Sequence, residues 1–480
     1  MISMSKASSI IGMAVFGAVL SAVPPARAQS SVGASTDPAT AQSPANGFWT
    51  RPHLLGDLGG IRPFLATYGI SLGLTETSEV WGNVTGGVHQ GADYDGLTEM
   101  SLGLDTDKAF GWAGGTFNVS AFQIHGRTIS SDNLHELHPL SSIEADRATR
   151  LWQLWYQQAF LDNRVDVKIG QQSIDQEFDL SQYAGLFLNA GFGWAVLPTN
   201  DLYASGPVYP LSSLGIRLRA HLAPALTALG GVFDDNPPGG PFANDSQLRD
   251  GEASGTRFNL NTGALWIGEL QYAVNAAPAK ACDNVACGLP GTYKLGGWYD
   301  TGGFPDQRIA NDGLALADPA SSGIPRTDRG NFSVYAVMDQ MVWRAGPGDP
   351  RSIGIFVRPE GAPGDRNLID FSIDAGVTLQ APFAGRDKDT LGIAYSYAKI
   401  GNAASGFDRD KAFFTGTSYP VRSGESVIEL TYQAQITPWW QLQPDFQYII
   451  DPGGGIQNPL VPSRSIGDEA VFGLRTVITF

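Results

Sequence analysis

The last ten residues of the chain, VFGLRTVITF (residues 471–480), decide the fold, because apolar and polar side chains alternate along them up to the final position. Phe472, Leu474 and Phe480 share one face, whereas Gly473 and Arg475 share the other. This period of two belongs to a β-strand and not to a helix. A strand with one apolar and one basic face must separate an apolar environment from a polar one.

The stretch SLGIRLRAHL (residues 213–222) shows which environment lies on each side. Ile216 and Leu218 alternate with Arg217 and Arg219. Two arginines facing lipid would each cost several kcal/mol, so the basic face must look into a polar interior. The stretches SVIELTYQAQI (426–436) and LIDFSIDAGVTL (368–379) alternate in the same way. A soluble β-sandwich also alternates, so periodicity alone leaves both arrangements open.

Windows of this kind recur along the chain, separated by turns rich in Gly, Pro, Asp and Asn. They predict strands that begin near residues 69, 97, 116, 150, 164, 213, 225, 262, 292, 331, 352, 368, 390, 425, 439 and 469. An even count is typical of bacterial outer-membrane barrels, and barrels of this size enclose water. We therefore predict an all-β fold, a transmembrane antiparallel β-barrel of sixteen strands over residues 69–480.

The N-terminal part of the chain has a different character. Residues 1–28 have the basic, apolar and small-residue regions of a signal peptide, residues 29–47 lack periodicity and are expected to be disordered, and residues 48–68 predict a short helical segment. Without the signal peptide, 29 basic residues face 47 acidic ones, which argues against nucleic acid as a partner. No later apolar run reaches the 18 residues of a transmembrane helix, so a membrane role requires a barrel.

Motifs for catalysis and cofactors are weak. Cys282 and Cys287 are expected to form one local disulfide in an exported chain, and two thiols fall short of a metal site. A Gly-x-Ser-x-Gly match around Ser71 lies inside an alternating strand, whereas a nucleophile needs a sharp strand-to-helix turn. We therefore expect no catalytic residue, no metal and no cofactor.

The expected luminal faces carry side chains suited to a neutral sugar, which offers hydroxyls and an apolar ring face. Forked donors, carboxylate acceptors and aromatic platforms are expected at Arg217, Arg219, Arg358, Arg475, Asp339, Asp370, Glu429, Trp155 and Trp298. The alternative is that these residues only keep the lumen wet. Residues 171–211 are too long for a turn and predict a loop folded into the barrel, with Asn189, Phe192 and Trp194 approaching the constriction.

Several longer stretches resemble the carbohydrate-selective outer-membrane porin family of OprB type. They include LLGDLGGIRPFLATYGISL (54–72), RLWQLWYQQAFLDNRVDVKIGQQSIDQEF (150–178), LFLNAGFGW (186–194), GPVYPLSSLGIRLR (206–219) and ELTYQAQITPWWQLQPDFQYIIDPGGG (429–455), besides the closing stretch. The resemblance implies a sixteen-stranded barrel that passes glucose and other simple sugars. It also implies an Arg-rich constriction, for which Arg147, Arg150, Arg217 and Arg219 are the best positions, and a terminal Phe480 read by the outer-membrane assembly machinery.

The sequence thus predicts a passive sugar-selective porin in the outer membrane of a Gram-negative bacterium. Its expected partners are carbohydrates, outer-membrane lipid and the assembly machinery. The alternatives are a general porin, an outer-membrane barrel enzyme such as a lipase or esterase, and a secreted sugar-binding β-protein. The sequence leaves open whether the barrel works singly or as a homo-oligomer.

Overall fold

The computed structural model describes residues 47–239, 253–275, 288–346 and 348–480. The strands are β1 Ile70–Thr85, β2 Gly91–Asp105, β3 Gly115–Gly126, β4 Ala148–Phe160, β5 Val165–Gln172, β6 Ser213–Ala223, β7 Leu226–Asp234, β8 Ala264–Val274, β9 Gly291–Ala310, β10 Pro325–Arg344, β11 Ser352–Gly361, β12 Ile369–Gln380, β13 Thr390–Ile400, β14 Gly424–Thr437, β15 Trp440–Ile450 and β16 Glu469–Thr479. The α-helices are α1 Ile61–Thr67, α2 Thr106–Phe110, α3 Ala190–Gly193, α4 Val196–Asp201, α5 Asn402–Thr415 and α6 Pro452–Gly455. Short helical turns are η1 Ser130–Leu134, η2 Ile174–Gln176, η3 Ala184–Leu186 and η4 Tyr203–Ser205.

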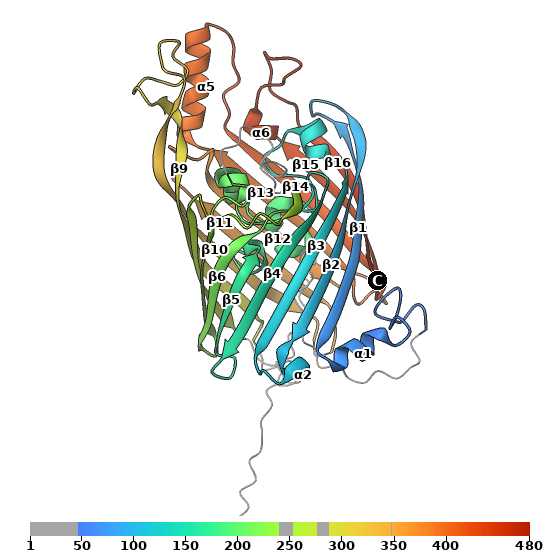
Figure 1. The fold of residues 1–480 in the computed structure, drawn as a ribbon. Helices are drawn as coiled ribbons and strands as arrows, with labels where there is room; N and C mark the ends of the chain where they lie inside the picture. The colour runs from blue at the N-terminus through green and yellow to red at the C-terminus, as the bar shows by residue number, and fades with distance from the viewer. Residues whose placement is uncertain (1–46, 240–252, 276–287, 347) are drawn as a thin grey trace, which may run out of the picture.

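The strands form one closed antiparallel barrel in which each strand pairs with its neighbours in the chain (Figure 1). The barrel closes where β16 pairs with β1, in register from Thr75 opposite Thr479 to Asn83 opposite Val471, before the register shifts by one residue at Thr85. Within this seam Gly473 lies opposite Trp81, and any Cβ at position 473 would collide with the Trp81 ring. The closing strand thus removes the sheet's free edges, as the predicted barrel requires.

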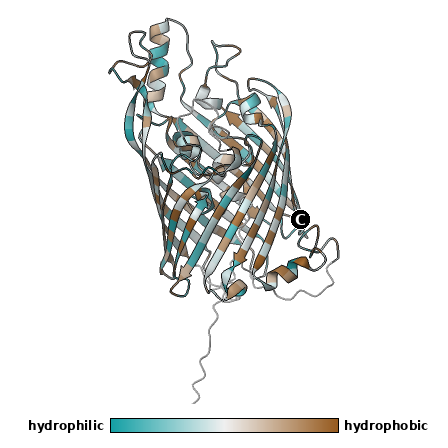
Figure 2. Ribbon diagram, in the orientation of Figure 1, coloured by the Kyte–Doolittle hydropathy of each residue, from teal (hydrophilic) through white to brown (hydrophobic). Residues whose placement is uncertain are grey.

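Hydrophobic and hydrophilic residues alternate along many of the strands (Figure 2). On β6, Ile216 and Leu218 are 47% and 48% exposed, whereas Arg217 is 1% exposed. On β16, Phe472 and Leu474 are 54% and 46% exposed, and Arg475 turns inward. The structure therefore confirms an apolar outer surface around a polar interior, the arrangement of a membrane barrel and the inverse of a soluble sandwich.

The two ends of the barrel differ in the length of their connections. Both α1 and the C-terminus lie at the end with short turns, such as those between β4 and β5 and between β6 and β7 (Figure 1). Connections carrying α5 and α6 lie at the other end. Short turns are periplasmic in outer-membrane barrels, which makes the first end the periplasmic one.

The barrel interior contains parts of two long connections. We call residues 173–212, between β5 and β6, the constriction loop, and residues 127–147 the β3–β4 loop. Phe178 and Trp194 of the constriction loop pack against Phe233, Trp298 and Tyr335 of the wall in one buried cluster. The loop therefore occupies the lumen instead of extending into solvent, as its length and aromatic content predict.

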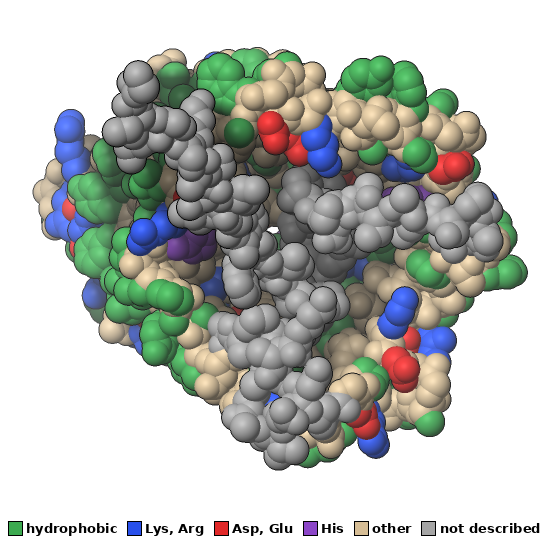
Figure 3. Space-filling view, turned by 90° about the horizontal axis from the view of Figure 1, so that it is seen from below, with side chains coloured by type: hydrophobic (Ala, Val, Ile, Leu, Met, Phe, Trp, Pro, Cys, Tyr) green, Lys and Arg blue, Asp and Glu red, His purple; other side chains and the backbone are tan. Residues whose placement is uncertain are grey.

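The N-terminal segment lies against the periplasmic rim. Arg62 donates to the carbonyl oxygens of Leu72 at 2.7 Å and Phe480 at 2.5 Å, which ties α1 to the seam. Trp439, in the β14–β15 turn, donates to the carbonyl of Phe48 at 3.0 Å. From this end, hydrophobic side chains crowd the outer edge with basic and acidic ones between them (Figure 3). Among the described helices, none is long and apolar enough to cross a membrane.

The predicted strand starts agree with the structure at fourteen of sixteen positions to within two residues. The prediction was wrong for β2 and β10, which begin six residues earlier than expected. The polar residues at the start of β2 and β10 precede the periodic windows. They still form backbone hydrogen bonds with the neighbouring strands, because those strands extend alongside them. Helix α1 fills only residues 61–67 of the predicted segment 48–68. The signal peptide, the tail up to residue 46 and the pair Cys282 and Cys287 lie outside the described residues.

Candidate functional site

Carboxylates of the barrel wall hold the backbone of the constriction loop. Glu429 on β14 accepts hydrogen bonds from the backbone N–H groups of Leu188 at 2.6 Å and Asn189 at 3.0 Å. Asp339 on β10 accepts one from the backbone of Gln182 at 2.8 Å. Loop N–H groups buried in the lumen would otherwise lack acceptors, at a cost of about 1–3 kcal/mol each. These wall carboxylates thus fix the position of the loop.

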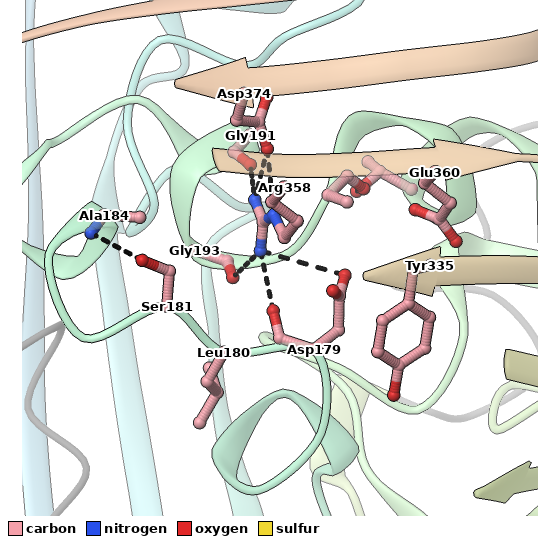
Figure 4. A network of polar contacts seen from close by, with 12 residues as sticks. Asp179, Leu180, Ser181, Ala184, Gly191, Gly193, Tyr335, Arg358, Glu360 and Asp374 are labelled. Atoms are coloured by element: carbon pink, nitrogen blue, oxygen red, sulfur yellow. Dashed lines mark hydrogen bonds and ion pairs between the residues drawn. The ribbon is translucent and has the colours of Figure 1, made fainter. Parts of the chain in front are cut away.

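Arg358 on β11 holds the loop carbonyls from the same wall (Figure 4). Its guanidinium donates to the carbonyl oxygens of Gly191 at 2.5 Å, Asp179 at 2.8 Å and Gly193 at 3.1 Å. It also donates to Asp374 Oδ2 on β12, from Nη2 at 2.6 Å and from Nε at 2.9 Å. Arg358 is 1% exposed. Five donors in a rigid fork let one arginine bridge three loop carbonyls and a wall carboxylate.

A histidine of the β3–β4 loop forms a second set of contacts with the wall. The ring of His138 is fully buried, with Nδ1 2.6 Å from Glu425 Oε1 and Nε2 2.7 Å from Ser396 Oγ. Glu425 also accepts a hydrogen bond from the backbone of His138 at 2.9 Å. This loop therefore folds onto β13 and β14 inside the barrel.

Arg475, on the closing strand, binds the same loop from the other side. Its guanidinium forms an ion pair with Glu79 on β1 and donates to the hydroxyls of Ser141 and Ser142, each at 3.2 Å. Arg475 faces the lumen, as the sequence predicts, but its donors are directed at the wall and at the loop.

The opposite wall carries a charged cluster at the start of the constriction loop. Arg217 on β6 forms ion pairs with Asp166 on β5 and with Glu177 of the loop, the latter at 2.6 Å between Nε and Oε2. It also donates to Gln157 Oε1 at 2.9 Å. Because Glu177 belongs to the loop, Arg217 links β4, β5 and β6 to the point where the loop enters the lumen.

The remaining members of this cluster are Lys168, Arg219 and Trp155. The Lys168 ammonium pairs with Glu177 and lies 4.6 Å from the centre of the Trp155 ring, within the range of a cation–π contact. Arg219 donates from Nε to Asp166 Oδ2 at 2.7 Å, and its side chain is 35% exposed. Burial raises the pKa of the Glu177 carboxyl, but Lys168 and Arg217 outweigh it and hold that pKa below its ordinary value. We call Lys168, Arg217, Arg219, Asp166, Glu177 and Trp155 the basic cluster.

Four other predicted site residues pack between loop and wall. Asn189 is fully buried and donates from its side-chain amide to Gln447 Oε1 at 2.9 Å. Arg150 is 2% exposed and donates to the carbonyl of Pro210 at 3.4 Å. Trp298 donates from its ring nitrogen to Glu360 Oε1 at 3.1 Å, and Trp194 packs in the same buried cluster. They support the loop through buried contacts.

The structure turns Asp370 away from the site, and the predicted role of Arg147 stays a prediction. A β-bulge between residues 369 and 371 turns Ile369 inward, where it is fully buried, although the alternation predicts that it faces lipid. Asp370 instead binds Lys399 Nζ at 2.6 Å, on the face of β13 that also carries the exposed Ile393. Arg147 is exposed and precedes β4.

Sequence reasoning missed most of the partners of these residues. Asp166, Lys168 and Glu177 complete the basic cluster, and His138 with Glu425 holds the second loop. Asp166 and Lys168 alternate with Val165 and Val167 on β5, so the strand period alone would have placed both in the lumen. Within the described ranges, no group of three or more His, Cys, Asp or Glu side chains is arranged to hold a metal ion.

Comparison with known proteins places this barrel in a family. The family model described as "Carbohydrate-selective porin, OprB family" matches residues 89–480. The chain belongs to this family. As an OprB-family porin, it is a carbohydrate-selective channel of the Gram-negative outer membrane.

Two curated relatives match this OprB-family chain over nearly its whole length. Porin B of Pseudomonas aeruginosa is 26% identical over 466 residues, which cover 91% of this chain and 94% of the relative. The putative porin QuiX of Acinetobacter baylyi is 24% identical over 469 residues, which cover 91% of this chain and 95% of the relative.

A solved structure supports the same fold. The high-pH structure of Pseudomonas putida OprB superimposes with a TM-score of 0.77 at 23% identity. The alignment covers 90% of this chain and 100% of the Pseudomonas putida chain. The shared fold is therefore the closed barrel.

Proposed function

We propose that this porin passes glucose and other simple uncharged sugars by passive diffusion, and that selection occurs where the constriction loop narrows the lumen. The observation that carries this proposal is the way the loop is fixed: Glu429, Asp339 and Arg358 hold its backbone from one wall, and Arg217 holds its start from the other. A narrowing that keeps its shape can discriminate between solutes by size and by hydrogen bonding.

We propose two roles for the predicted site residues. Arg358, Asp339, Glu429, Asn189 and Arg475 position the loops, because their polar atoms bind loop atoms in buried contacts. In the basic cluster, Arg219 contacts the solute, because its side chain is 35% exposed. Trp155 and Lys168 are each 8% exposed and Arg217 is 1% exposed, so they hold the cluster and the start of the loop in place. A planar guanidinium donates hydrogen bonds that match the hydroxyls of a sugar.

We propose that the channel carries out no chemistry on its solute. Ser71, in the Gly-x-Ser-x-Gly match, lies within β1 and pairs with Gly103 of β2. It is not on the strand-to-helix turn that exposes a nucleophile in hydrolases. The regular strand around Ser71 therefore supports a channel over a barrel lipase or esterase.

The proposed partners besides sugars are outer-membrane lipid and the assembly machinery. The outward faces carry exposed apolar residues such as Leu218 and Leu474, which match an acyl-chain environment. Phe480 ends the closing strand, where its N–H donates to the Leu74 carbonyl at 2.9 Å. A terminal aromatic at the seam is in a position to be read while the last strand is still unpaired.

Sugar-dependent conductance tests the function. The purified full-length mature protein is inserted into planar bilayers in KCl, and single-channel current is recorded while glucose or maltotriose is added. We expect sugar to reduce the current reversibly and in a saturable manner, at concentrations where a non-sugar solute of similar size changes only bulk conductivity. Channels that respond to no sugar would reduce the protein to a general porin and refute the proposal.

A further inference from the structure

A cavity of about 440 Å³ lies on the periplasmic side of the constriction loop. It is lined by parts of β1, β14, β15 and β16, by Leu186 of the loop and by Arg62 of α1. Its volume falls within the range of about 300–1,000 Å³ that small-molecule sites occupy. A solute that passes the loop towards the periplasm enters this cavity before it leaves the barrel.

Four glutamines on two neighbouring strands line one side of the cavity: Gln433 and Gln435 on β14, and Gln441 and Gln443 on β15. We call them the amide ladder. Gln441 donates from Nε2 to Gln435 Oε1 at 2.8 Å, and Gln433 donates to Gln443 Oε1 at 3.3 Å. Gln443 in turn donates to the carbonyl of Leu186 at 2.8 Å. The ladder therefore runs from the tip of the constriction loop towards the rim.

The ladder has hydrogen-bonding capacity left for a solute. Within the described part of the chain, the side-chain oxygens of Gln433 and Gln441 accept no hydrogen bond, and both side chains are only half-buried. Gln443 is 3% exposed and uses its amide on the loop and on Thr431, so it holds the ladder in place. An amide offers donors and acceptors together, as a sugar hydroxyl does.

The cavity offers little unbalanced charge. None of the described residues that line it is Asp or Glu. Arg475 is paired with Glu79, and Arg62 donates to the carbonyls of Leu72 and Phe480. Trp439 also lines the cavity, but its ring stacks against those of Trp49 and Trp440 at 6.3 and 6.2 Å between centroids. The site therefore suits an uncharged, hydroxyl-rich solute held by hydrogen bonds and not by stacking.

We propose that the amide ladder is a second sugar-binding subsite, which takes uncharged pyranose sugars on the periplasmic side of the constriction through hydrogen bonds from Gln433 and Gln441. This inference rests on the proposed function. Neutral amides bind a sugar weakly enough to let it leave the barrel. Several weak sites in series favour flux over retention.

The test compares the full-length mature protein with the double variant Gln433→Leu/Gln441→Leu, which keeps side-chain bulk and removes both amides. Binding constants for glucose and maltotriose are taken from the sugar-dependent drop in single-channel current. Losing one or two neutral hydrogen bonds should weaken binding by about three- to tenfold. Open-channel conductance should stay close to that of the wild type, because neither residue holds the loop.

Gln380→Leu is the matched control. Gln380 lies at the periplasmic end of β12, outside the cavity lining, and binds the backbone of the β12–β13 turn. It should leave sugar binding unchanged. If the double Leu variant does not assemble, Gln433→Asn/Gln441→Asn retracts both amides by one methylene without making the face apolar. It should also weaken binding, by less.

The outcomes separate the two proposals. Unchanged sugar binding in the folded Leu or Asn variant, together with sugar block in the wild type, overturns the subsite and leaves the sugar channel standing. If Gln380→Leu weakens sugar binding to the same degree, the proposed subsite is overturned as well, since the effect is then not specific to the amide ladder. A wild-type channel that no sugar blocks refutes both.

Discussion

Replacing Arg358 by alanine should release the constriction loop without opening the barrel. The substitution removes three hydrogen bonds to loop carbonyls and leaves Asp374, which is 1% exposed, without its cation. Removing one partner of a buried ion pair costs about 3–5 kcal/mol. Since each 1.4 kcal/mol is a factor of ten, the population with an undocked loop should rise by roughly two to three and a half powers of ten.

Hydrogen exchange and conductance measure this release independently. In Arg358→Ala, the amides of residues 179–194 should lose protection, whereas those of the barrel strands should keep it, because the backbone pairing of β11 does not use the Arg358 side chain. Single-channel conductance should rise and become noisier, and block by maltotriose should weaken, because the narrowing no longer keeps one shape.

Two further variants make the reasoning refutable. In the double variant Arg358→Ala/Asp374→Ala the wall carboxylate is removed as well, so loop release that persists there is due to the lost contacts with the loop: the three carbonyls and the Asp179 carboxylate, which lies 3.8 Å from the guanidinium. Arg351→Ala removes an arginine that pairs with Asp349 in the exposed β10–β11 turn, and it should change neither measurement. Protection of residues 179–194 and conductance that both stay at wild-type values in Arg358→Ala would refute the proposed positioning role.

Two other predictions follow from the charges. Arg217→Ala and Arg219→Ala should both shift the reversal potential in a KCl gradient towards cation preference. Only Arg217→Ala should also add current noise, since Arg217 alone of the two binds Glu177 of the loop. Equal noise in both variants would contradict this. Burial raises the pKa of Glu144, in the β3–β4 loop, from 4.5 to about 7. The folded loop therefore favours the protonated carboxyl, and its stability should fall as the pH rises from 4.5 through 7. Hydrogen exchange of residues 127–147, corrected for intrinsic rates, should show this step, and Glu144→Gln should abolish it; a step that survives in the variant belongs to another group.

Much of the wall could be predicted from the sequence because strand sidedness is a local property. Arg217 lies between the outward-facing Ile216 and Leu218, and Arg475 follows the outward-facing Leu474. Because a charge that faces lipid is costly, each arginine can only point into the lumen. The rule fails at Asp370, where the bulge between residues 369 and 371 shifts the alternation by one position. Nothing in the order of those residues marks the bulge, because Asp370 continues the polar period of Ser372 and Asp374.

The sequence by itself determined the alternating strands and which face of each is polar, since the period of two is a local property, and its resemblance to the OprB family implied the closed barrel. Only the tertiary structure decided which luminal side chains remain available to a solute. Arg358 and Gly191 are 167 positions apart in the chain, and Glu429 and Leu188 are 241 apart, so no local pattern pairs them. A luminal arginine has the same sequence signature whether its donors meet a sugar or a loop carbonyl, and its role is fixed only when the loop enters the barrel.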